Sequence, residues 1–82
     1  MMEKNKAAII LNNIEDIKTF AAEVSKFEAD VNIRKNSTVY DAKSLLAIIL
    51  LGGLEPVIVE INTDDEDILD LFQYKMSQFK IQ

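Results

Sequence analysis

Two kinds of apolar spacing alternate along this chain, and their order limits the folds that it can adopt. Short apolar or alternating segments predict strands at 6–11, in both arms of a hairpin over 29–42 with a polar tip at 35–37, and at 56–62. Helical spacing connects Ile14, Ile17, Phe20, Ala21, Val24 and Phe27, and later Ile68, Leu69, Phe72, Met76 and Phe79. Four strands whose helices must share one face predict an α+β two-layer sandwich.

Both helical segments carry signals for their first residues. Asn13 is suited to cap the first helix, and Glu15 and Asp16 would complement the dipole in its first turn. In the second helix, Thr63 and Glu66 have the spacing of a capping box, in which each side chain bonds a backbone N–H of the other. We therefore expect helices that begin near residues 14 and 64.

A run of seven apolar residues at 45–51 separates the hairpin from the last strand. Ser44 before the run is a good N-cap and Gly52 after it is a good residue to end a helix, so the segment favours a short helix. A buried strand is the alternative reading of the same residues. The run is too short to cross a membrane, which takes about 20 apolar residues.

A two-turn helix on one sheet can bury only one of its sides. The side left outside would then carry Leu45, Leu46 and Ile49. Grouped apolar side chains on a surface often mark a site for a protein partner, and we predict this use here. The alternative is that a loop or the first helix covers them.

The composition excludes several classes of function. The 82 residues are enough for one domain, 1–82, and they include no histidine and no cysteine, which removes most metal sites and most general-base mechanisms near neutral pH. A net charge of −5 without a basic cluster argues against a nucleic-acid surface. We expect a cytoplasmic protein that is not an enzyme, needs no cofactor or metal, and binds neither nucleic acid nor membrane.

Carboxylates are the remaining candidates for chemistry. The run at 64–67 has the wrong spacing for a calcium loop and suits the first turn of a helix instead. Glu15 and Asp16 are adjacent, so on a helix their side chains diverge by about 100°. A carboxylate-based ligand-binding domain is therefore an alternative with little support from the spacing.

Two local sequences resemble the HPr family, the histidine-containing phosphocarriers of the bacterial sugar phosphotransferase system. They are SKFEADVNI at 25–33 and KSLLAIILLG at 43–52. The resemblance extends over roughly residues 6–79. It implies an open-faced sandwich with a four-stranded antiparallel sheet and three helices on one face.

The same resemblance places Asn13 where the family has its phosphorylated histidine, and Glu15 and Asp16 where it has an arginine and a proline. The family's site is a helix N-terminus that accepts phosphate through backbone N–H groups. An asparagine side chain has no nucleophilic nitrogen, and two carboxylates would repel a phosphoryl group. The resemblance thus implies a member without histidine phosphocarrier activity that acts through proteins, either phosphotransferase-system components or a transcription regulator.

Ser44 matches the position at which Gram-positive members of the family are phosphorylated by a regulatory kinase. The family's natural variant without histidine, the catabolite-repression HPr-like protein, works through that serine. This implies an alternative function as a regulator phosphorylated on Ser44, while a plain helix cap is the other reading. Lys43 is the nearest cation in sequence, whereas Glu15 and Asp41 would oppose a phosphate there.

Overall fold

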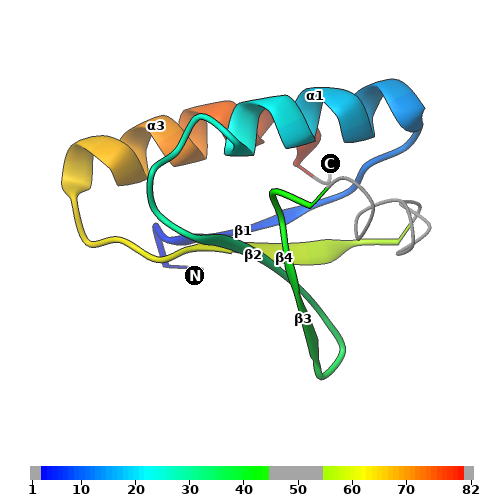
Figure 1. Cartoon of the computed structure of the whole chain (residues 1–82), viewed down its shortest axis with the longest axis horizontal. Coiled ribbons are helices and arrows are strands. Elements are labelled where there is room, and N and C mark those ends of the chain that lie inside the picture. Colours follow the sequence, from blue (N-terminus) through cyan, green and yellow to red (C-terminus); the bar gives the residue numbers. More distant parts are fainter. Residues whose placement is uncertain (1–2, 45–54, 81–82) are drawn as a thin grey trace.

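The computed structural model describes residues 3–44 and 55–80 (Figure 1). In chain order its elements are β1 (Lys6–Ile9), α1 (Ile14–Val24), β2 (Val31–Lys35), β3 (Thr38–Asp41), β4 (Val57–Ile61), α3 (Glu66–Met76) and the 3₁₀ turn η1 (Ser77–Phe79). The helix predicted over 45–51 lies outside the described residues, together with Leu45, Leu46 and Ile49.

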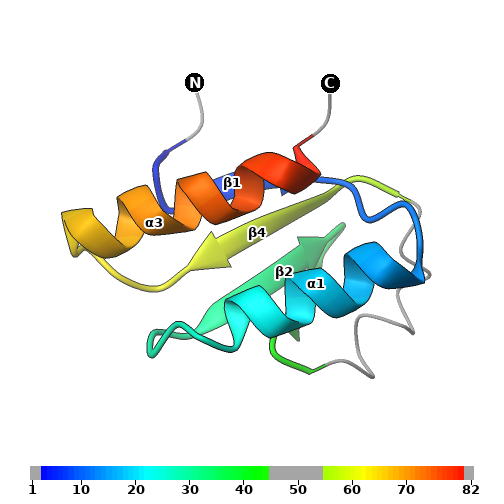
Figure 2. The same cartoon turned by 90° about the horizontal axis from the view of Figure 1, so that it is seen from above.

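The four strands form one sheet in the order β1-β4-β2-β3, and all neighbouring strands are antiparallel. Helices α1 and α3 lie side by side on one face of this sheet and run in opposite directions (Figures 1 and 2). The predicted α+β architecture and the four-stranded antiparallel sheet are therefore confirmed. Of the three predicted helices, the described residues contain these two.

The core lies between the sheet and the two helices. Along β4, Val57, Val59 and Ile61 are buried, while Ile58 and Glu60 point to the other face, as their alternation predicts. Two edge-to-face ring pairs link α1 and the loop after it to α3 and η1: Phe20 and Phe79 have centroids 5.7 Å apart, and Phe27 and Phe72 have centroids 6.2 Å apart. The helical stripes in the sequence thus identify the helical side of this core.

The hairpin of β2 and β3 turns more tightly than the sequence suggests. Lys35 pairs with Thr38, so Lys35 is the last residue of β2 and only Asn36 and Ser37 form the turn. Asn36 has a φ of 56°, a left-handed conformation that asparagine tolerates better than most residues. Val39 remains 48% exposed on the face of the sheet opposite the helices.

The predicted beginning of α3 is wrong by two residues. The cap is Asp65, whose Oδ1 accepts hydrogen bonds from the backbone N–H groups of Asp67, at 3.0 Å, and Ile68, at 3.3 Å. Thr63 instead accepts the N–H of Asp65 at 3.2 Å, so Thr63 and Glu66 form no capping box. The carboxylate of Asp65 satisfies two N–H groups at once, which a threonine hydroxyl farther from the helix does not.

The C-terminal part of the chain closes the outer edge of the sheet at β1. Gln73 on α3 donates hydrogen bonds from Nε2 to the carbonyls of Lys4, at 2.7 Å, and Lys6, at 2.8 Å. Ile10 N–H donates to the carbonyl of Phe79 at 2.9 Å, and Lys80 forms a bridge with Ile9. These contacts fix α3 over β1.

Candidate functional site at the beginning of α1

The predicted cap of α1, Asn13, is confirmed, and Asp16 in the first turn accepts a further hydrogen bond from the backbone before the cap. Asn13 is extended, and its Oδ1 accepts a hydrogen bond from Asp16 N–H at 2.8 Å. Asp16 Oδ2 in turn accepts the N–H of Asn12 at 3.1 Å. The chain thus satisfies two backbone donors at this helix end with its own side chains, in the manner of a capping box.

The first turn of α1 is negatively charged. Glu15 is exposed and Asp16 is half-buried. Because both lie in the first turn, their carboxylates are at the positive end of the helix dipole. In the part of the chain that the structure describes, neither has an ion-pair partner within 4 Å. A phosphate approaching this turn would meet two negative charges and would compete with Asp16 for the N–H of Asn12.

Ile14, the first residue of α1, is 62% exposed beside these carboxylates. The sequence placed Ile14 in the buried stripe, and that prediction is wrong. At about 100° per residue, Ile14 lies some 80° around the helix from Val24, at the margin of the buried stripe. Sequence reasoning therefore missed a large apolar side chain at the beginning of α1, although the helical angle was a signal for it.

Ser44 is half-buried and follows a turn held by Asp41. Asp41 Oδ1 accepts the N–H of Lys43 at 2.9 Å, and its backbone carbonyl accepts the N–H of Ser44 at 3.1 Å. Lys43 Nζ donates to the carbonyl of Phe27 at 2.6 Å, beyond the end of α1. Since α1 is about 16 Å long, the Lys43 ammonium and Asn13 lie toward opposite ends of the helix.

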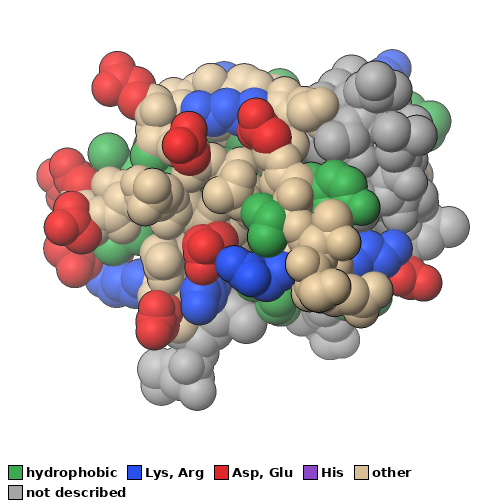
Figure 3. Space-filling view, turned by 60° about the horizontal axis from the view of Figure 1, so that its bottom comes forward, with side chains coloured by type: hydrophobic (Ala, Val, Ile, Leu, Met, Phe, Trp, Pro, Cys, Tyr) green, Lys and Arg blue, Asp and Glu red, His purple; other side chains and the backbone are tan. Residues whose placement is uncertain are grey.

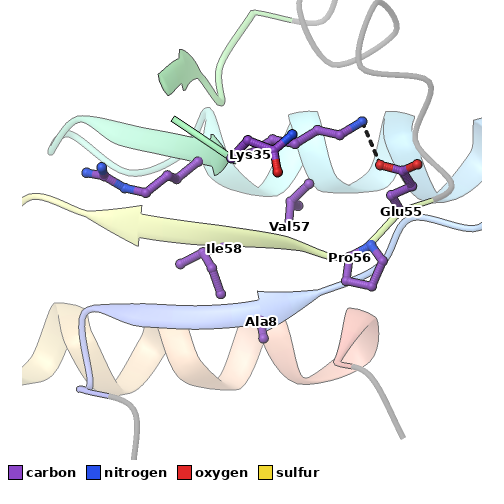
Figure 4. A pocket seen from close by; sticks show the side chains of 8 residues that line it. Ala8, Lys35, Glu55, Pro56, Val57 and Ile58 are labelled. Atoms are coloured by element: carbon purple, nitrogen blue, oxygen red, sulfur yellow. Dashed lines mark ion pairs between the residues drawn. The ribbon is translucent and has the colours of Figure 1, made fainter. Parts of the chain in front are cut away.

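Two surface hollows have linings that include neither the beginning of α1 nor Ser44. One, of about 200 Å³, lies where β2 and β4 meet; its lining includes Arg34, Ile58 and the ion pair of Lys35 with Glu55 at 3.0 Å (Figure 4). The other, of about 290 Å³, lies at the end of α3. Neither lining includes Glu15, Asp16 or Asp64, so neither supports the carboxylate-based site.

The face of the sheet opposite the helices mixes charges with apolar side chains (Figure 3). Glu60, at its centre, lies 3.6 Å from Lys6 Nζ and 3.9 Å from Arg34 Nη2. Among the described residues no group of three or more acidic side chains is placed to hold a metal ion. No described helix is long and apolar enough to span a membrane.

A sheet of this topology with α1 and α3 on one face defines the class as an open-faced α+β sandwich. A family model described as "PTS HPr component phosphorylation site" matches residues 16–73. The chain therefore belongs to the HPr family of the phosphotransferase system, as the resemblance predicted. HPr proteins are phosphocarriers that interact with other proteins of that system.

A solved structure shares the fold. The crystal structure of HPr-C-His from Thermoanaerobacter tengcongensis aligns with a TM-score of 0.65 at 24% identity, over 92% of this chain and 96% of that one. No curated protein matches the chain significantly. The family match begins at Asp16, so the correspondence of Asn13 with the family's histidine stays a prediction.

Proposed function

We propose that this chain is an HPr-family protein without histidine phosphocarrier activity that acts through protein–protein contact. The chain contains no histidine, and the beginning of its first helix is occupied by its own side chains. The hydrogen bonds from Asp16 N–H to Asn13 Oδ1 and from Asn12 N–H to Asp16 Oδ2 carry this proposal. The first of them uses a backbone donor that a helix N-terminus otherwise offers to an anion.

Protein contact is supported by the exposed apolar side chain at the same helix end. Ile14 is a single residue, but it adjoins Asn13, where the resemblance places the family's phosphorylated histidine. The proposed surface combines Asn13 and Ile14 with Leu45, Leu46 and Ile49, which stay a prediction from the sequence. Apolar side chains grouped inside a polar rim are typical of the buried centre of protein interfaces.

The test is a titration of the ¹⁵N-labelled chain with phosphotransferase-system components, followed by amide chemical shifts. We expect shifts at Asn13, Ile14 and residues 45–49, and weaker binding for Ile14→Asn. Val39→Asn is the matched control, because Val39 is also exposed and apolar but lies on the far side of the sheet. Shifts absent from those residues, or equal losses in both variants, would exclude this surface.

The loss of phosphocarrier activity has its own test. Asn13→His alone should accept no phosphoryl group from a phosphorylated donor protein of the system, because Glu15 and Asp16 still repel it. The triple variant Asn13→His, Glu15→Arg, Asp16→Pro removes both charges and supplies the cation, and we expect it to accept phosphate. Efficient transfer to the single variant would show that the electrostatic argument is wrong.

Ser44 is a second candidate site, for regulation. The turn held by Asp41 presents Ser44 beside Lys43, whose ammonium could exchange its carbonyl partner on Phe27 for a phosphate. We expect one added phosphate on the intact protein after incubation with the regulatory kinase and ATP, and none on Ser44→Ala. An unchanged mass for the parent chain would exclude this role.

A further inference from the structure

The outer face of α3 carries two large apolar side chains that stay exposed in the described part of the chain. Tyr74 is 73% exposed and Leu71 is 48% exposed, and three positions separate them, so they are neighbours on the helix surface. The buried stripe of the same helix, at Leu69, Phe72 and Met76, faces the opposite way. Asp67 lies one turn before Leu71 on this outer side. We call Asp67, Leu71 and Tyr74 the α3 outer patch.

A hollow of about 290 Å³ adjoins the patch at the end of α3 and is lined by Tyr74, Lys75, Ser77 and Gln78. Ser77 and Gln78 in this lining bond to the helix, while Lys75 pairs with Glu23 on α1. Ser77 Oγ donates to the carbonyl of Tyr74 at 2.6 Å, and Gln78 Nε2 donates to that of Lys75 at 3.2 Å. The carbonyls of Tyr74 and Lys75 thus already have hydrogen-bond partners. A group that enters the hollow beside the Tyr74 ring therefore need not be polar.

The charge on the N-terminal side of the patch is strongly negative. Five carboxylates lie between Asp64 and Asp70. Lys4 pairs with two of them, Glu66 at 3.0 Å and Asp70 at 3.1 Å. Within the described residues, no cation lies within 4 Å of Asp64 or Asp67. The apolar pair thus adjoins carboxylates that have room for an external cation.

We propose that the α3 outer patch docks a basic amphipathic helix of a partner protein. An aliphatic side chain of that helix packs between Leu71 and Tyr74 and reaches toward the hollow. Lysine or arginine residues on either side of it pair with Asp67 and Asp64. In this mode of binding, the α3 outer patch recognises the partner helix by one apolar anchor and by complementary charges.

Charge decides which occupant fits. A second copy of this chain also has a net charge of −5 and would bring carboxylates against carboxylates, which opposes association. An anionic membrane surface is repelled for the same reason. A basic segment is attracted by the acidic turn and gains apolar contact at Leu71 and Tyr74. This surface is separate from the beginning of α1, so it does not depend on the function proposed there.

The test uses the full ¹⁵N-labelled chain and two synthetic peptides of identical lysine, leucine and alanine composition. In the first peptide the leucines form one helical face, and in the second the order is scrambled. We expect saturable shifts at Asp67, Leu71 and Tyr74 with the first peptide, and about tenfold weaker binding of the second. Equal binding of both peptides, no saturable binding, or shifts centred elsewhere would overturn the proposal.

Variants separate this surface from the one at α1. Leu71→Asn with Tyr74→Asn should weaken binding of the first peptide about tenfold, and Asp67→Asn by a few-fold with a smaller salt dependence. Ile14→Asn, an exposed apolar residue on α1, should leave the affinity unchanged. Because all of these side chains are exposed, each variant should keep a dispersed amide spectrum. An equal loss for Ile14→Asn would show non-specific binding.

Discussion

The two described helices begin with similar caps but use their first turns differently. In α1, Asn13 Oδ1 accepts the N–H of Asp16, and Asp16 Oδ2 accepts the N–H of Asn12 before the helix. In α3, Asp65 alone accepts two backbone N–H groups. At each start the cap position is filled by a side chain of the chain itself.

Their charges separate the two starts. Glu66 in the first turn of α3 is paired with Lys4, which precedes β1, so that turn is fastened to the edge of the sheet. Glu15 in the first turn of α1 has no such partner in the described chain, and Ile14 beside it is exposed. The beginning of α3 is therefore bound to the edge of the sheet by an ion pair, whereas the beginning of α1 leaves a carboxylate and an apolar side chain exposed.

The largest effect is expected from core variants, which test whether α1 and α3 contribute equally to the free energy of unfolding. Phe20 on α1 and Phe72 on α3 are both fully buried, and each makes an edge-to-face contact with another ring. Phe20→Ala and Phe72→Ala should each lower the free energy of unfolding by about 3–5 kcal/mol, through lost burial and a cavity. Urea unfolding followed by circular dichroism measures both. A loss below about 2 kcal/mol for either one would show that its helix is not an equal part of the core.

The caps come next. Asn13→Ala and Asp65→Ala should each cost about 1 kcal/mol in urea unfolding, with Asp65→Ala the more costly because it leaves two N–H groups without their cap. Asn13→Ser is the matched control, since serine caps helices as well as asparagine does, and it should cost little. If Asn13→Ser cost as much as Asn13→Ala, the cap would not be the source of the stabilisation.

Periodicity was enough to predict the described strands, the two described helices and most of the core, because these depend on which residues can be buried together. It failed where one side chain decides the outcome. Asp65 rather than Thr63 starts α3, since four acidic residues in succession offer several possible caps and only geometry selects one. The hairpin turn is shorter than predicted because Lys35 pairs with Thr38.

The candidate site was predicted only in part. Asn13 was identified as a cap from its residue type, but the hydrogen bond from Asn12 N–H to Asp16 depends on a backbone path that the sequence does not state. Ile14 was assigned to the core because its spacing fits the stripe, while its place at the first residue of α1 exposes it. The outer patch of α3 was not predicted, since Leu71 and Tyr74 lie between the buried positions.

A smaller effect concerns the ion pair that joins the two helices. Glu23 Oε2 on α1 lies 3.1 Å from Lys75 Nζ on α3, and this ion pair holds the pKa of Glu23 below its usual 4.5. A lowered carboxyl pKa stabilises the folded state at pH above 4.5, and this stabilisation is lost as the pH falls through the lowered value. Glu23→Gln should therefore be less stable than the parent at pH 7, with the gap narrowing on acidification in urea unfolding. A gap that did not change with pH would assign the effect to packing.

The smallest effect on stability is expected from the ion pairs of Lys4 at the beginning of α3. Hydrogen bonds to Glu66 and Asp70 hold the pKa of Lys4 above its usual 10.5, so its stabilisation is present below pH 10.5 and is lost as the pH rises through the raised value. These groups are all exposed, so water and salt screen the pair, and Lys4→Ala should change stability less than any variant above. Thermal unfolding of both proteins at low and high salt at pH 7 measures this, and the difference should vanish at high salt. A difference that persisted there would mean that the aliphatic stem of Lys4, and not its charge, holds α3 to the edge of the sheet.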